Sequence, residues 1–161
     1  MTEKPANSPL ADLKLGTGAS PIASPTVQKI EPKCGFHWGT GRRKSSVARV
    51  RIRPGSGIFK VNRREMKEYF TRPQDIGNAI ASLKATNTTA SLDIFVNVKG
   101  GGTTGQSGAI MLGVARALKN YDPSLAQKLR DGGLLTRDGR MVERKKPGQS
   151  GARKRFQFSK R

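Results

Sequence analysis

Residues 92–98 read LDIFVNV, and residues 105–121, GQSGAIMLGVARALKNY, follow after a run of glycines. Apolar side chains occupy every second position of the first stretch, as in a strand with one buried face. They are Leu92, Ile94, Val96 and Val98. The second stretch carries an apolar stripe at helical spacing, formed by Ile110, Val114, Ala117 and Leu118. We therefore expect a strand and a long helix at the centre of the fold.

A second alternating stretch lies upstream, at residues 45–53, SSVARVRIR. Its two faces differ, because Ala48, Val50 and Ile52 share one side while Val47, Arg49, Arg51 and Arg53 share the other. This pattern predicts a half-buried strand that shows arginines to a partner. A turn at residues 54–57, PGSG, precedes another short apolar stretch at 58–61, so the two stretches predict a β-hairpin.

The helices are less uniformly marked. Asn62 is predicted to cap a short helix over residues 64–70, with Glu65 completing a capping box. Residues 74–86 fit either a helix or a strand. Ser124 is predicted to cap a helix that reaches Asp131. Together these elements indicate an α+β fold, a small mixed β-sheet with helices on one face.

Charge divides the chain into regions. The 161 residues include 31 Lys or Arg and only 11 Asp or Glu, a net charge of +20. Residues 1–35 lack apolar periodicity and are predicted to be a disordered extension. Residues 36–135 hold most of the apolar residues and are predicted to form the globular domain. Residues 136–161, with ten basic and two acidic residues, are predicted to form an extended basic tail.

Composition also excludes several classes of protein. Cys34 is the single cysteine, so no internal disulfide framework is possible and an intracellular setting is expected. No apolar run is long enough for a signal peptide or a membrane span. Cys34 and His37 have the spacing of two zinc ligands, but the chain has no other Cys or His to complete a site. We therefore expect no metal.

The glycine-rich segment at residues 100–105, GGGTTG, matches the pattern GxGxxG between a strand and a helix. A dinucleotide site also needs a following strand that ends in an acid, and a Walker loop needs Lys-Ser or Lys-Thr after the glycines. Neither is present, so no cofactor and no small-molecule substrate are expected. The glycines can still let the backbone approach an RNA phosphate at the helix N-terminus, or they can form a tight turn without a ligand.

Two further segments combine cations with flexibility or aromatic rings. Residues 39–44, GTGRRK, are expected to form a flexible loop that follows a phosphate backbone. In the tail, Phe156 and Phe158 stand among cations and could stack on unpaired bases or pack on the protein surface. A charge of this size implies nucleic acid or another anionic surface as the partner.

Five blocks of the chain closely resemble one known family. They are GTGRRKSSVARVRIRPGSGIFKVNRR at 39–64, VKGGGTTGQSGAI at 98–110, GVARAL at 113–118, LLTRDGRMVERKK at 134–146 and QFSKR at 157–161. In this order they resemble ribosomal protein S-nine, the ninth protein of the small ribosomal subunit, in its bacterial form. The resemblance covers residues 36–161.

The resemblance implies a non-enzymatic structural protein of a cytoplasmic ribosome, built around a β-α-β unit with a left-handed crossover. Its body would bind small-subunit rRNA in the head, beside neighbouring ribosomal proteins. The end of its tail, Ser159, Lys160 and Arg161, would contact the anticodon stem-loop of the peptidyl-site tRNA. The candidate rRNA contacts are Arg42, Arg43, Lys44, Arg49, Arg51, Lys99, Gly100, Gly101, Gly102, Arg137, Arg140, Arg144, Lys145, Lys146, Arg153, Lys154 and Arg155.

The tail departs from the family pattern at Pro147 and at residues 149–151, QSG. We expect its middle to make fewer phosphate contacts, while an extended tail of 18 residues could span about 60 Å.

Two other classes of protein stay open on the residues alone. One is a DNA-binding protein, although no helix-turn-helix or zinc-finger signature is present, and the other is a nucleotide-dependent enzyme that uses the glycine segment.

Overall fold

The computed structural model describes residue 32 and residues 34–159. The predicted extension over residues 1–35 lies almost wholly outside this part of the chain, as do Lys160 and Arg161. The strands are β1 (His37–Arg43), β2 (Ser46–Pro54), β3 (Phe59–Val61), β4 (Arg64–Glu65) and β5 (Leu92–Lys99). The helices are α1 (Met66–Tyr69), α2 (Pro73–Thr86), α3 (Thr103–Tyr121), the short 3-10 helix η1 (Pro123–Leu125) and α4 (Ala126–Asp131).

The five strands form one sheet in the order β1-β2-β5-β3-β4. β2 runs antiparallel to both β1 and β5, whereas β3 runs parallel to β5. The sheet is therefore mixed, and with the helices it confirms the α+β fold. The parallel strands β3 and β5 are joined through α1 and α2, which makes a β-α-β unit. The left-handed crossover of this unit stays a prediction.

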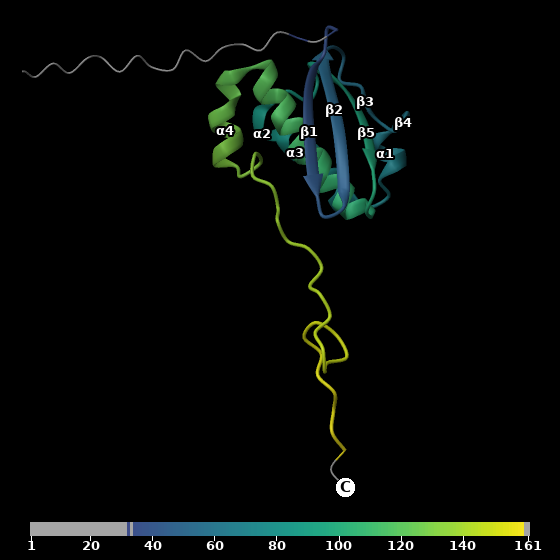
Figure 1. Cartoon of the computed structure of the whole chain (residues 1–161). Coiled ribbons are helices and arrows are strands. Elements are labelled where there is room, and N and C mark those ends of the chain that lie inside the picture. Colours follow the sequence, from purple (N-terminus) through teal and green to yellow (C-terminus); the bar gives the residue numbers. More distant parts are fainter. Residues whose placement is uncertain (1–31, 33, 160–161) are drawn as a thin grey trace, which may run out of the picture.

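Helices α2, α3 and α4 lie together on one side of the sheet (Figure 1). The core between them contains the inward side chains of β2 and β5 and the apolar stripe of α3, as the alternation predicts. Its largest fully buried members are Phe70, Ile52, Leu83, Leu92, Ile94, Ile110, Leu118, Leu129, Val50, Val61, Val96 and Val114. None of the helices in the described part of the chain is long and apolar enough to cross a membrane.

The expected hairpin between residues 45–53 and 58–61 is wrong. β2 pairs instead with β1 and β5, and β5 lies between β2 and β3 in the sheet. Residues 39–43 of the segment expected to be a flexible loop belong to β1, and its glycines reflect a close approach of α3. A Cβ at Gly41 would lie 1.9 Å from the carbonyl oxygen of Ala109 and one at Gly39 2.2 Å from that of Gly113. These glycines therefore make room for a helix.

Two of the expected helix caps are also wrong. Asn62 adopts φ +47° in the turn between β3 and β4, where its side chain accepts from the N–H of Val98 at 2.9 Å and donates to its carbonyl at 2.9 Å. Ser124 lies within η1, which Asp122 caps by accepting from the Ser124 N–H at 2.9 Å, and no side chain caps α4. The ambiguous residues 74–86 fall within the helix α2, whose first residue is Pro73, a position where the missing N–H of proline costs no hydrogen bond within the helix.

Candidate nucleic-acid interface

The glycine segment and the turn between β1 and β2 meet at one place on the surface. A shallow hollow of about 220 Å³ is lined by Lys44, Ser45, Ser46, Gly101, Gly102, Thr103, Thr104 and Gly105. Gly100 and Gly101 have φ values of +78° and +66°, and a Cβ on Gly101 would lie 2.1 Å from the Ser46 hydroxyl. Glycine is therefore required here by both backbone conformation and space.

The same hollow ends at the N-terminus of α3. No side chain caps this helix, and its N-cap residue is Gly102. The first N–H groups of a helix have no acceptor within the helix, so they are available to an anion together with the positive end of the helix dipole. Lys44 and Lys99 are exposed on the flanking segments. These features suit a phosphate oxygen close to the backbone, and the contact itself stays a prediction.

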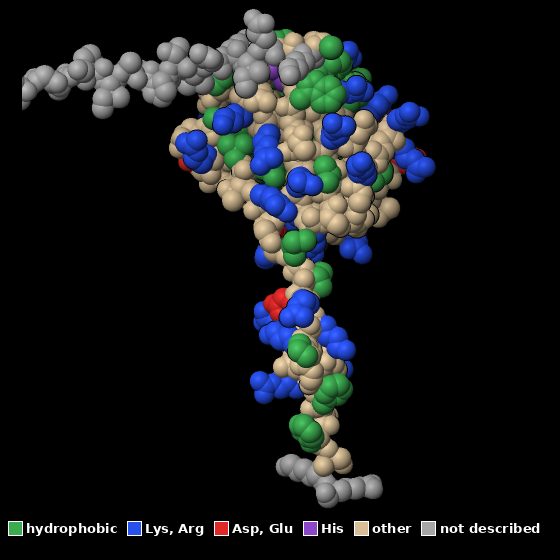
Figure 2. Space-filling view, viewed as in Figure 1, with side chains coloured by type: hydrophobic (Ala, Val, Ile, Leu, Met, Phe, Trp, Pro, Cys, Tyr) green, Lys and Arg blue, Asp and Glu red, His purple; other side chains and the backbone are tan. Residues whose placement is uncertain are grey.

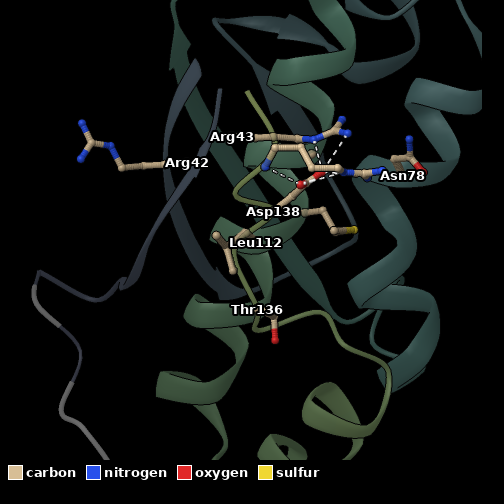
Figure 3. Close-up of a pocket in the computed structure, with 9 residues that line it drawn as sticks. Arg42, Arg43, Asn78, Leu112, Thr136 and Asp138 are labelled. Carbon is tan, nitrogen blue, oxygen red and sulfur yellow. Dashed lines mark hydrogen bonds and ion pairs between the residues drawn. The ribbon is translucent and has the colours of Figure 1, made fainter. Parts of the chain in front are cut away.

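Arg42 and Arg43 are neighbours in sequence but differ in what they contact. Figure 3 shows Arg42 pointing away from the pocket and Arg43 pointing toward Asp138. The Arg43 guanidinium lies 3.1 Å from a carboxylate oxygen of Asp138 and donates to the carbonyl of Thr104 at 2.8 Å. The guanidinium of Arg43 is therefore occupied inside the protein, whereas that of Arg42 is exposed to a ligand.

Asp138 ties the first residues after the body to β1. It also pairs with Arg140, at 3.0 Å. Hydrogen bonds from the Arg140 side chain, then from its backbone N–H and from Arg43, outweigh desolvation and hold the pKa of Asp138 well below its ordinary value. These contacts make Asp138 an ion-pair partner of Arg43 and Arg140 within a basic segment. They surround a pocket of about 200 Å³ beside α2 and α3.

Residues 137–159 contain no helix or strand and run away from the body (Figure 1). Figure 2 shows Lys and Arg side chains along this segment and over the visible face of the body, with few acidic ones. The exposed candidate cations are Arg137, Arg140, Arg144, Lys145, Lys146, Arg153, Lys154 and Arg155. Ser159 is exposed as well, while Lys160 and Arg161 lie outside the described residues.

The segment folds back on itself once. Glu143 pairs with Arg153, whose Nε donates to the carboxylate at 2.9 Å, and this hydrogen bond lowers the pKa of Glu143. Within the closed loop, the Gln149 N–H donates to the carbonyl of Lys146 at 3.3 Å. Residues 143–153 are therefore not extended, and a span of about 3.3 Å per residue overstates the reach of the tail.

Arg49 and Arg51 lie on the face of the sheet turned away from the helices, as the alternation predicts. The aromatic side chains beside Arg51 are Phe36 and Phe95, which no sequence pattern singled out as part of a binding surface. The Arg51 guanidinium lies 5.3 Å from the Phe36 ring centroid and 5.4 Å from that of Phe95. Phe95 could have been recognised, since it occupies an outward position of the strand predicted at residues 92–98.

The described residues contain no group of three His, Cys, Asp or Glu that could hold a metal ion. Cys34 is exposed. His37 is buried, and its ring packs edge-on against Tyr121 at a centroid distance of 5.3 Å. The two residues therefore differ in environment although their spacing matches a pair of zinc ligands.

A compact α+β body with cationic surfaces and a basic segment without a core is typical of proteins that bind nucleic acid. The chain belongs to the ribosomal protein S9/S16 family, whose model matches residues 41–161. It is 54% identical over 123 residues, 76% of this chain and 90% of the relative, to the small ribosomal subunit protein uS9 of Rhodopirellula baltica. The same identity and length relate it to uS9 of Mycoplasmopsis synoviae, with 94% of that relative covered.

The chain is also 50% identical over 140 residues to the small ribosomal subunit protein uS9m of Arabidopsis thaliana, covering 87% of this chain and 32% of that relative. The family predicted from the sequence is thus confirmed. The chain is a non-enzymatic structural constituent of the small ribosomal subunit and acts in translation. Because one relative is a mitochondrial form, the compartment of the ribosome stays a prediction.

Proposed function

We propose that the body binds small-subunit rRNA in the head of the subunit and that the tail reaches the peptidyl site. There Ser159, Lys160 and Arg161 contact the anticodon stem-loop of the tRNA. The observation that carries this proposal is the exposed, cation-rich segment at residues 137–159, which has no helix or strand to hold it. Such a segment gains order by neutralising phosphates.

The proposed roles of the body and the tail follow the domains expected from the sequence. Residues 36–135 form the rRNA-binding body, with a left-handed crossover between β3 and β5, and residues 136–161 form the tail. Neighbouring small-subunit proteins pack against the body in a cytoplasmic ribosome. Support for a boundary near residue 136 comes from Leu134 and Leu135, which pack on the core, and from the loss of burial after Asp138.

Within the body, two regions are proposed to meet rRNA. One is the hollow of Lys44 and the glycine segment at residues 100–102, with Lys99 and Arg42 beside it. The other is the outer face of the sheet with Arg49 and Arg51. Arg43 and Arg140 contribute mainly through Asp138, because that carboxylate occupies their guanidinium groups.

Within the tail, the remaining cations are proposed to contact phosphates on the way to the peptidyl site. Arg144, Lys145 and Lys146 are exposed in the loop that Glu143 and Arg153 close, whereas Lys154 and Arg155 follow it. Arg153 can take a phosphate only by giving up its bond to Glu143. The loop therefore supplies fewer free cations than its sequence contains.

Replacing Lys160 and Arg161 by Gln tests the tRNA contact. We expect subunits that contain this variant to assemble normally but to lose peptidyl-site tRNA faster, because two charges near the anticodon stem-loop are gone. The matched control is Lys128→Gln with Arg130→Gln, which removes two exposed charges from α4 instead. If purified subunits with the Lys160 and Arg161 substitutions release tRNA no faster than subunits with the control substitutions, the proposed tRNA contact is wrong.

Replacing Arg42 and Lys44 by Ala tests the rRNA contact of the body. Each lost phosphate contact lowers the slope of log affinity against log salt by about 0.7–0.9. We expect a smaller change for Arg43→Ala, whose guanidinium is already paired with Asp138. Filter binding of the full chain to small-subunit rRNA over a range of salt concentrations measures the slopes. A slope that the double variant leaves unchanged would remove this region from the interface.

A further inference from the structure

The face of the sheet that is turned away from the helices carries aromatic rings as well as cations. One row of paired residues crosses it, and its members are Trp38, Arg51, Phe95, Lys60 and Glu65. Phe36 precedes β1 and reaches the same row, since its ring meets that of Phe95 edge-on at a centroid distance of 6.2 Å and an angle of 84°. We call Phe36, Trp38 and Phe95 the aromatic row.

Two arginines lie over these rings. The Arg51 guanidinium is 5.3 Å from the Phe36 centroid and 5.4 Å from that of Phe95. The Arg53 guanidinium is 5.6 Å and 5.5 Å from the same two centroids. Cation–π attraction of this kind holds the planar guanidinium groups at the sheet surface. Rings and guanidinium groups together form a positively charged platform, in which the Phe36 and Phe95 rings stand nearly at right angles to each other.

The platform is open to a ligand. Trp38 keeps 45% of its surface exposed, and Phe36 and Phe95 are each partly exposed. A hollow of about 240 Å³ lies beside Phe95 and is lined by Arg51, Lys60, Arg63, Phe95, Val96 and Asn97. A second hollow of about 190 Å³ continues along β5 and is lined by Val47, Arg49, Asn97, Val98 and Lys99.

Among the residues that the structure describes, acidic groups do not offset this charge at the centre of the platform. The carboxylate of Asp93 is only 6% exposed, and it accepts from the N–H groups of Ser56 at 2.9 Å and Ile58 at 3.2 Å and from Arg53. Glu65 lies at the edge of the sheet, on β4. At the centre of the aromatic row, an anionic partner thus meets Arg51 and Lys60, while Glu65 lies at the end of the row.

We propose that this face binds unpaired nucleotides of RNA, with bases stacked on the aromatic row and Arg51 and phosphates held by Arg49, Lys60, Arg63 and Lys99. This inference rests on the proposed function, because it names the kind of RNA that the body takes. Bases in a duplex are stacked on one another and hide their faces, whereas unpaired bases offer a π-face to aromatic and guanidinium groups. The positive charge favours RNA over an apolar protein surface.

Trp38 is the single tryptophan of the chain, so its fluorescence reports on this face alone. We expect a single-stranded oligoadenylate of about ten nucleotides, within the usual range of site sizes, to quench Trp38 when it binds the full chain. A duplex RNA of the same length should bind through the other basic surfaces and leave the fluorescence nearly unchanged. Equal quenching by both RNAs, or by neither, would overturn the proposal.

The double substitution Phe36→Leu with Phe95→Leu tests stacking without changing charge. We expect it to weaken single-strand binding by about 5-fold or more, from the usual contribution of base–aromatic stacking, and to leave the salt slope unchanged. The matched control is Phe156→Leu with Phe158→Leu, which removes two rings from the tail. It should leave Trp38 quenching intact. Circular dichroism of the double variant verifies that the sheet is folded.

A crosslinking experiment separates failure of this inference from failure of the proposed function. A photoreactive phenylalanine analogue at position 95 should crosslink to an unpaired rRNA segment in assembled small subunits. Crosslinks to a ribosomal protein, or to paired rRNA, would overturn the inference even when the body still binds rRNA. The proposed function fails instead when the Arg42 and Lys44 substitutions leave rRNA binding and its salt slope unchanged.

Discussion

A single carboxylate decides which arginines at the base of the tail are free. Asp138 binds the guanidinium groups of Arg43 and Arg140, with Nη2–Oδ2 distances of 3.1 Å and 3.0 Å. The cations counted from the sequence are therefore not equivalent. Those near Asp138 fix the direction in which the chain leaves the body, and Arg42 and Lys44 remain open to phosphates.

Titration of Asp138 tests this arrangement. Its pKa in the folded chain lies below the ordinary value of about 3.9, so the ion pairs contribute stability that is fully present above that value. This stability is lost as the pH falls through the folded pKa. We expect Arg140→Ala to raise the pKa toward its ordinary value more than Arg43→Ala does, because the side-chain hydrogen bond from Arg140 is the largest cause of the shift. The backbone N–H bond of residue 140 remains in this variant.

Carbon-detected NMR of the Asp138 carboxyl in the full chain measures these midpoints. Asp93 is the internal control, since its pKa is lowered by hydrogen bonds from Ile58, Ser56 and Arg53 that outweigh desolvation. Neither substitution touches these groups, so the Asp93 midpoint should stay where it is. An Asp138 midpoint that ignores both substitutions would mean that the ion pairs do not form in solution.

At the scale of elements, the packing of α3 on β1 rests on the absence of side chains. A Cβ at position 41 would lie 1.9 Å from the carbonyl oxygen of Ala109 and 2.5 Å from the backbone nitrogen of Gly113. We expect Gly41→Ala to destabilise the fold by about 1–3 kcal/mol or more, as overpacking does. Neither neighbour is a flexible side chain that could rotate away. Urea denaturation of the full chain measures the change.

The matched control is Gly77→Ala in α2. A Cβ there meets nothing within 4 Å, and alanine favours a helix interior by about 0.5–1 kcal/mol over glycine. This variant should be as stable as the parent chain or more so. Equal loss of stability in both variants would show that the close approach of α3 to β1 is not what requires glycine.

Apolar periodicity decided which elements could be predicted from the sequence. β2, β5 and α3 carry strong apolar periodicity, so their types and buried faces follow from the sequence. β1 does not, because Gly39 and Gly41 occupy its inward positions and resemble a loop. The expected hairpin failed since strand pairing is decided by the whole sheet, where β5 lies between β2 and β3.

The helix caps were predicted wrongly because the residues involved make tertiary contacts that the local sequence does not show. Asn62 has the right type and spacing for a helix cap, but the backbone of Val98 in β5 takes both ends of its amide. The candidate site, too, could be predicted only in part. Cations could be found by counting, whereas their pairing with Asp138 or Glu143 and the position of Arg51 over two rings depend on tertiary contacts.

At the scale of the whole molecule, hydrogen bonding separates body and tail. Among residues 137–159, within the described part of the chain, the backbone N–H groups with an acceptor are those of Arg140, Lys146 and Gln149. α3, in contrast, forms a continuous helix of 19 residues against the core. The tail therefore has few backbone hydrogen bonds of its own that could protect its amides from exchange.

Hydrogen exchange should report this difference. In the free chain, we expect tail amides to exchange near their unprotected rates and amides of α3 and β5 to exchange several orders of magnitude more slowly, through rare opening of the core. In assembled small subunits the tail amides should become protected, because the proposed rRNA contacts order the chain around them. Mass spectrometry of peptides from the full chain, free and in subunits, measures both.

Protection already present in the free chain would mean that the tail docks on its own body. Rapid exchange that persists in subunits would mean that RNA does not order it.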